Sequence, residues 1–189
     1  MKKLLLLFAM ALMTISVMAE GHMKFKGVEI DGTPKEFVQK MKEKGFTYVK
    51  NDEGTEMMLG DFAGNKNCIL GIVSSNNKVA KVSVIIPDET STWSLLYNKY
   101  ITLKEMLTKK YGEPAIDKEE WQGYSTPRDD NSKMHELKMN RATIGAYYEM
   151  PEGSIEISLF SMQMQCCILI SYYDAANQQT AIDNAMEDL

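Results

Sequence analysis

Histidine, tryptophan, cysteine and proline are all scarce in this sequence of 189 residues, which holds 2, 2, 3 and 5 of them. A hydrolase needs a nucleophile, a base and an orienting group, and only His22 and His135 could supply an imidazole base. His22 lies in a stretch without pattern at 20–23 and His135 in a polar stretch, so we interpret both as non-catalytic. The sequence contains no Gly-x-Ser-x-Gly elbow, His-Glu-x-x-His pair or phosphate-binding glycine loop. We expect no cofactor, and favour a non-enzymatic protein over the alternative of an enzyme with a dispersed site.

The cysteines are too few to form a disulfide scaffold, and their odd number prevents complete pairing within the chain. They are Cys68, Cys166 and Cys167, and in a strand the last two would point to opposite faces. We predict three unpaired, buried thiols. Met162, Met164 and Cys166 would share one face of a continuous strand, and thioether plus thiolate suits Cu(I). Sulfur side chains that fill gaps in the core are the simpler interpretation, and a copper-binding protein stays as an alternative.

Long apolar runs are absent except near the start, where Leu4 to Met18 follows two lysines. This run is shorter than the roughly 20 residues that a membrane-spanning helix needs. Together with small or modest side chains up to Ala19, it predicts a signal peptide cleaved after that residue. We therefore expect no membrane span after cleavage. Because no cysteine follows Ala19, we also expect no lipid anchor, and a periplasmic or secreted protein.

The sequence has no excess of positive charge, since 21 basic residues face 26 acidic ones. Lys2 and Lys3 would leave with the signal peptide, which reduces the basic residues from 21 to 19 and gives the remainder a formal charge of −7. Such a balance argues against nucleic acid and anionic membranes as ligands. We therefore expect any partner to be another protein of the envelope or the exterior.

Two helices stand out from local signals. Thr33 and Glu36 have the spacing of a capping box, and Gly45 can end the first helix. The apolar stripe between Trp93 and Tyr111 predicts a longer second helix over 92–111. Alternating patterns bounded by turn residues predict strands. They cover 25–30, 46–50, 56–62, 67–75, 79–86, 115–121, 142–150, 154–160 and 166–173.

The order of these elements is a helix followed by four strands, twice over. We predict a signal peptide at 1–19, one repeat at 20–89, a second at 90–174, and a C-terminal helix at 175–189 capped by Asp174. Short connections make neighbouring strands antiparallel. The fold class is therefore α+β, with tandem helix plus four-stranded repeats forming one curved sheet and helices on one face.

Several short motifs resemble small secreted proteins of uncharacterised function from Gram-negative bacteria. They are Phe25 to Gly32, Glu36-Phe37-Val38, Lys44-Gly45-Phe46, Leu107 to Pro114 and Ile170 to Asp174. The helix–four-strand repeat is similar to that of the β-lactamase inhibitor protein and of small outer-membrane assembly lipoproteins. The resemblance implies this fold and a protein-binding concave sheet. The disulfides within each domain of the inhibitor have no match here, so its activity is not carried over.

Strand alternation also predicts a binding surface. If Ile155, Ile157 and Leu159 face the helices, then Glu156 and Phe160 face away from them. Aromatic side chains on an open sheet are typical of protein-recognition surfaces. We predict a binding face on the outer side of the sheet, together with the polar stretch at 122–138. The residues that we place on this face are Phe62, Ile69, Tyr147, Phe160 and Tyr173.

Overall fold

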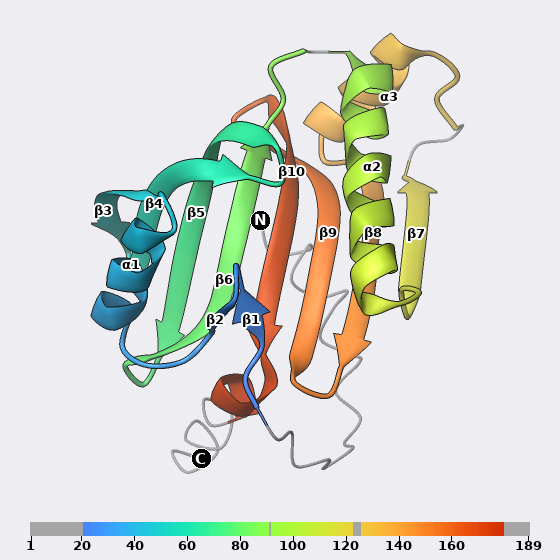
Figure 1. Ribbon diagram of the computed structural model, residues 1–189. Helices are drawn as coiled ribbons and strands as arrows, with labels where there is room; N and C mark the ends of the chain where they lie inside the picture. The colour runs from blue at the N-terminus through green and yellow to red at the C-terminus, as the bar shows by residue number, and fades with distance from the viewer. Residues whose placement is uncertain (1–20, 91, 123–125, 180–189) are drawn as a thin grey trace, which may run out of the picture.

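A computed structural model describes residues 21–90, 92–122 and 126–179, which form an α+β fold (Figure 1). Its main element is an open, eight-stranded sheet in which every neighbouring pair is antiparallel, confirming the predicted class. In spatial order the strands are β3 (Thr47–Asp52), β4 (Thr55–Phe62), β5 (Asn65–Ser75), β6 (Lys78–Pro87), β10 (Gln165–Asp174), β9 (Gly153–Met162), β8 (Ala142–Met150) and β7 (Ile116–Trp121).

The sheet consists of two four-stranded meanders that meet at one seam. β3 to β6 form the first and β7 to β10 the second, and β6 pairs with β10. The seam runs from Lys81 opposite Tyr173 to Pro87 opposite Cys167. α1 (Pro34–Glu43) precedes the first meander and α2 (Trp93–Tyr111) the second, which is the predicted order of elements.

Both predicted helices form, because local caps define their ends. Thr33 Oγ1 accepts a hydrogen bond from the Glu36 amide at 3.3 Å, and Glu36 Oε2 accepts one from the Thr33 amide at 2.9 Å. α2 ends before Gly112, whose φ of +91° is costly for other residues. Both helices lie on the same face of the sheet (Figure 1). No helix within the described ranges is long and apolar enough to cross a membrane.

The core lies between these helices and the sheet. Ile155, Ile157 and Leu159 are buried, as the alternation of β9 predicted. α2 covers them with a stripe that begins at Trp93 and recurs every three or four residues, as predicted. Burial of each large apolar side chain stabilises the fold by about 1.5–3 kcal/mol, so this face provides the main stabilising energy.

A third helix occupies much of the stretch that we predicted as a polar loop. α3 (Asp130–Lys138) begins at Asp129, whose carboxylate accepts a hydrogen bond from the Ser132 amide at 2.9 Å. Met134 and Leu137 are buried against the end of the sheet, whereas His135 is exposed. Because only these two residues of α3 are buried, the sequence contains no apolar stripe long enough to predict a helix there.

The segment at 25–30 is a hairpin rather than the predicted single strand. β1 (Lys24–Phe25) pairs with β2 (Val28–Glu29) about Lys26 and Gly27, whose φ angles are +49° and +80°. Two such residues form the tight turn that joins antiparallel strands. The turn directs Phe25 into the core, where its ring lies edge-on to Tyr172 with centroids 5.3 Å apart.

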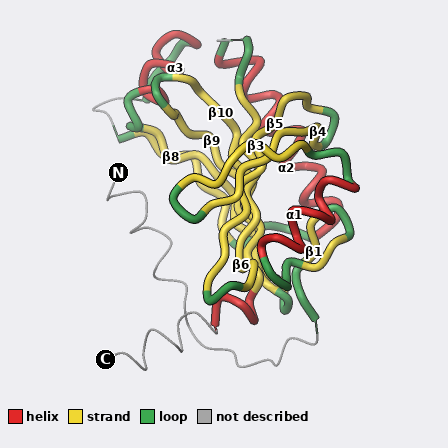
Figure 2. Tube along the Cα trace, turned by 90° about the vertical axis from the view of Figure 1, so that its left-hand side faces the viewer, coloured by secondary structure: helices red, strands yellow, loops and turns green. Residues whose placement is uncertain are grey.

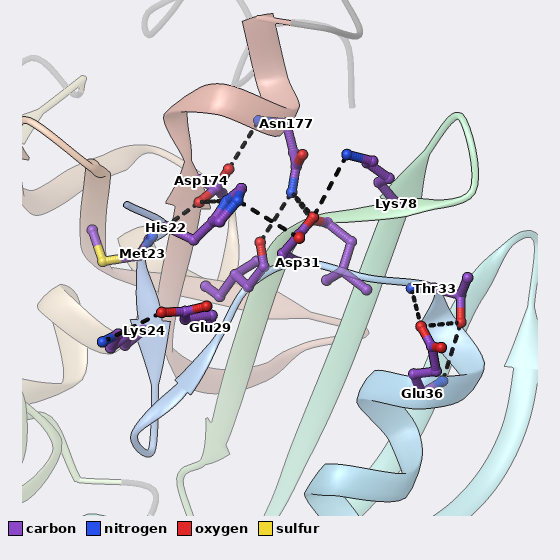
Figure 3. A network of polar contacts seen from close by, with 12 residues as sticks. His22, Met23, Lys24, Glu29, Asp31, Thr33, Glu36, Lys78, Asp174 and Asn177 are labelled. Atoms are coloured by element: carbon purple, nitrogen blue, oxygen red, sulfur yellow. Dashed lines mark hydrogen bonds and ion pairs between the residues drawn. The ribbon is translucent and has the colours of Figure 1, made fainter. Parts of the chain in front are cut away.

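A buried carboxylate fixes the start of this hairpin (Figure 3). Asp174 is fully buried and accepts hydrogen bonds from the amides of Met23, at 2.9 Å, and Asn177, at 2.8 Å. His22 Nδ1 lies 3.1 Å from the same carboxylate. His22 and Met23, which belong to the stretch at 20–23 that has no sequence pattern, are therefore held in place. The hydrogen bond from the Asn177 amide confirms Asp174 as a helix cap, and the rest of the predicted C-terminal helix, 180–189, lies outside the described residues.

The Asn177 side chain completes this anchor. Its amide nitrogen Nδ2 donates to the carbonyl oxygens of Ile30, at 3.1 Å, and Val79, at 2.9 Å. One buried side chain thus connects the hairpin, the start of β6 and the end of β10 (Figure 3). Because buried polar groups are stable only when hydrogen-bonded, this network holds three distant segments in one arrangement.

Candidate functional site

Helices α1 and α2 do not cover the opposite face of the sheet (Figure 2), and the strands present partly exposed apolar side chains on that face. Four of the five predicted binding residues, Ile69, Tyr147, Phe160 and Tyr173, alternate along their strands with residues of the helix-covered core. Leu59 and Val73 are 42% and 37% exposed beside them. We call this surface the outer face; its apolar residues are Leu59, Ile69, Val73, Ile85, Tyr147, Phe160, Leu169 and Tyr173.

Phe62, the fifth predicted residue, lies on the helix-covered side. Its ring stacks on Phe25 with centroids 5.5 Å apart and packs against the core. Met58 of β4 is buried, and a Cβ at Gly60 would point at the ring of the buried Phe46, so every second residue of this strand faces inward. Met58, Gly60 and Phe62 therefore share the inward face, and the prediction for Phe62 was wrong.

Two charged side chains and one tyrosine lie together on the outer face, on three middle strands of the sheet and at one end of the seam. The Tyr173 hydroxyl donates a hydrogen bond to Glu156 Oε2 at 3.2 Å. The ammonium group of Lys81 lies 4.7 Å from the centroid of the Tyr173 ring, a cation–π geometry. We call Lys81, Glu156 and Tyr173 the central triad. It spans the seam, because Lys81 belongs to β6 and the other two to the second meander.

Partial burial perturbs the titration of this triad. It raises the pKa of Glu156, an effect that the Tyr173 hydrogen bond and Lys81 partly offset. Burial also lowers the pKa of Lys81, against the opposing effect of Glu156. Among the described residues no oxygen acceptor lies within hydrogen-bonding distance of the Lys81 ammonium group. The strand pattern predicted that Glu156 faces outward, but Lys81 joins it only through the pairing of β6 with β10.

The proposed copper ligands do not converge. Gln163 and Met164 have φ angles of +51° and +68° and form the turn between β9 and β10. The chain therefore reverses between Met162 and Cys166, which we had placed on one strand face. Met162 and Met164 are 40% and 55% exposed, whereas Cys166 is buried on the helix side. The prediction of a shared ligand face was wrong.

The three cysteines are free and buried, as predicted. Cys166 and Cys167 are adjacent on β10, so their side chains point to opposite faces. Burial raises the pKa of the Cys166 thiol to about 11 and also raises the pKa values of Cys68 and Cys167. At neutral pH all three stay protonated, and protonated thiols are poor nucleophiles and poor metal ligands.

The His22–Asp174 pair is the arrangement that most resembles catalytic chemistry. The second ring nitrogen of His22, Nε2, lies 3.6 Å from Oδ2 of Asp31, so a carboxylate lies beside each nitrogen of the imidazole. Within the described residues no hydroxyl or thiol is hydrogen-bonded to His22. No cluster of three His, Cys, Asp or Glu residues in the described ranges could hold a metal ion. The pair therefore acts as an anchor of the hairpin.

Comparison of the chain with family models, with curated proteins and with solved structures gave no match.

Proposed function

We propose that this chain is an exported protein that binds another protein of the cell envelope or the exterior through its outer face. The observation that carries the proposal is an apolar, aromatic surface that includes the half-buried central triad. Soluble monomers rarely leave large contiguous apolar patches uncovered, and such patches mark interaction sites. Aromatic residues at the centre of an interface contribute most of its binding energy. The resemblance to the β-lactamase inhibitor protein implies the same use of a sheet.

The central triad indicates the chemistry of the partner. The Lys81 ammonium group has three donors, and in the part of the chain that the structure describes it faces the Tyr173 ring and no hydrogen-bonded oxygen acceptor. Covering the face would remove more water from this charge, which is costly without a hydrogen-bonded partner. The partner that fits is a folded protein whose apolar surface places a carboxylate opposite Lys81. A charge-assisted hydrogen bond would then replace the lost hydration.

The test is affinity capture from an envelope extract with the protein lacking residues 1–19, followed by affinity measurement on each captured protein. Phe160→Ala and Lys81→Met should each weaken binding by about tenfold or more, as loss of a central contact does. Met106→Ala is the matched control, because Met106 is 54% exposed on α2, away from the outer face. It should leave affinity unchanged.

Two results would contradict the proposal. One is a partner whose affinity is equal for wild type, Phe160→Ala and Lys81→Met. The other is a homodimer of this chain, detected by sedimentation and broken by the same two variants, because the outer face would then be occupied by a second copy.

A further inference from the structure

A hollow lies on the helix side of the molecule, between α2 and the edge strand β7. Its volume is about 290 Å³. Two polar contacts cross it. The Tyr97 hydroxyl donates a hydrogen bond to Glu119 Oε2 at 2.7 Å, and Lys104 forms an ion pair with Asp117. Positions 97 and 104 share one face of the helix, and 117 and 119 one face of the strand. The hollow is therefore a built feature of two rigid elements.

Between these two contacts lies Tyr100, which also lines the hollow. Its side chain is 2% exposed, and among the described residues its hydroxyl is the one buried side-chain oxygen or nitrogen without a hydrogen-bond partner. A buried hydroxyl without a partner loses its hydration and gains nothing in return. The nearby Tyr148 shows the usual solution, since its hydroxyl donates to the Lys104 carbonyl at 3.1 Å and contacts Thr108 at 2.9 Å.

The hollow also contains an uncompensated negative charge. Lys104 neutralises Asp117, but within the described residues no cationic group lies within ion-pair distance of Glu119. Lys118 also lines the hollow, but its ammonium group pairs with Glu120 at 3.5 Å. The free charge of the hollow is therefore the Glu119 carboxylate.

Two aromatic rings complete the lining. The centroids of Tyr97 and Tyr100 lie 5.9 Å apart. Burial, together with the hydrogen bond to Glu119, raises the pKa of Tyr97 to about 12, so it remains a neutral phenol. Aromatic faces attract cations through their quadrupoles. Carboxylate, free hydroxyl and aromatic rings all favour a ligand that is positively charged and rich in hydrogen-bond donors.

We propose that this hollow binds a small organic cation that carries a primary ammonium group. The ammonium group would pair with Glu119, donate a hydrogen bond to the Tyr100 oxygen and lie against the Tyr97 ring. A larger hollow of about 450 Å³, lined by Lys26, Lys44 and Asp61 among others, has a carboxylate but no aromatic ring in its lining. In the described chain it contains no buried polar atom without a partner.

The test uses n-butylammonium chloride as the probe and n-butanol as its uncharged counterpart. Trp93 provides the signal, because its ring stacks on Tyr97 with centroids 5.2 Å apart, and calorimetry provides an independent readout. Wild type should bind n-butylammonium saturably and n-butanol not at all. Glu119→Gln, which keeps an oxygen for Tyr97, should weaken binding by about tenfold or more, because the ion pair is lost. Glu120→Gln is the matched control on the opposite face of the same strand and should change affinity less than about twofold.

Tyr100→Phe keeps the ring and removes the hydroxyl, so it tests the site even if Glu119→Gln fails to fold. It should weaken binding by about three- to tenfold, the loss of one hydrogen bond. Tetramethylammonium, which has no N–H donor, should bind more weakly than n-butylammonium. Its affinity for Tyr100→Phe should equal its affinity for wild type. The proposal is wrong if wild type shows no saturable binding, or if Glu119→Gln and Glu120→Gln behave alike.

Discussion

Replacing Tyr100 by phenylalanine should stabilise the protein, an unusual outcome for a change in a core. The hydroxyl of this residue is buried without a hydrogen bond in the described structure, and the ring is already packed. Leaving such a group unsatisfied costs about 1–3 kcal/mol. Removal of the single oxygen creates a void far smaller than a methyl group, so packing losses stay small. We therefore expect the free energy of unfolding to rise by about 1 kcal/mol.

Tyr148 provides the matched control. It is equally buried, but its hydroxyl contacts both Thr108 and the Lys104 carbonyl. Tyr148→Phe removes both hydrogen bonds and leaves the carbonyl without this donor, so it should lower the free energy of unfolding by about 1–2 kcal/mol. The two variants carry the same chemical change and should shift stability in opposite directions.

Urea denaturation at equilibrium, followed by tryptophan fluorescence, measures both changes. For a protein of this size about 1 kcal/mol corresponds to a shift of roughly 2–4 °C in melting temperature, so thermal melts give a second reading. Equal destabilisation by Tyr100→Phe and Tyr148→Phe would refute the reasoning, because it would mean that the Tyr100 hydroxyl has a partner.

Three further predictions concern other parts of the fold. Ile157→Ala should lower the free energy of unfolding by about 2–5 kcal/mol because Ile157 is fully buried, whereas Phe160→Ala on the outer face should cost less than half as much in the same melts. Burial raises the pKa of Glu156, so just above pH 4.5 the native state binds more protons than the unfolded state, and this group makes the free energy of unfolding fall as pH rises. Denaturation at several pH values should therefore show the free energy of unfolding of wild type falling relative to that of Glu156→Gln. A difference between the two proteins that does not change with pH would contradict this prediction. Asp174→Ala should cost about 3–5 kcal/mol by removing a buried, hydrogen-bonded carboxylate, and should increase amide hydrogen exchange at Met23.

Strands and helices with strong local signals could be predicted closely. The strand predicted at 142–150 matches β8 at both ends, since it alternates cleanly and lies between turn residues. α2 begins one residue after its predicted start and ends where expected, because a long apolar stripe and Gly112 mark its extent. In these cases the period of the side chains and the chemistry of the ends agree, so local sequence is sufficient.

Errors arose where the face of a residue depended on distant pairing. Phe62 is the last residue of β4, whose sequence does not alternate cleanly, and only the packing of Met58 and Phe62 against the core decides which face of this strand points inward. The turn at Lys26 and Gly27 reverses the chain within a pattern that also fits one strand. The contact between Lys81 and Tyr173, and the isolated hydroxyl of Tyr100, follow from tertiary packing and have no signal in the sequence.

The seam between β6 and β10 has a consequence for the order of folding. Within each meander every strand pairs with its neighbour in sequence, whereas the seam joins β6 to β10, which are separated in sequence by α2 and by the other three strands of the second meander. Closing so long a loop is entropically costly, and contacts of this kind slow folding. We infer that the meanders form early and associate late. Because Lys81 comes from one meander and Tyr173 from the other, an intermediate with separate halves has no central triad, so the ability to bind a partner would report that folding is complete.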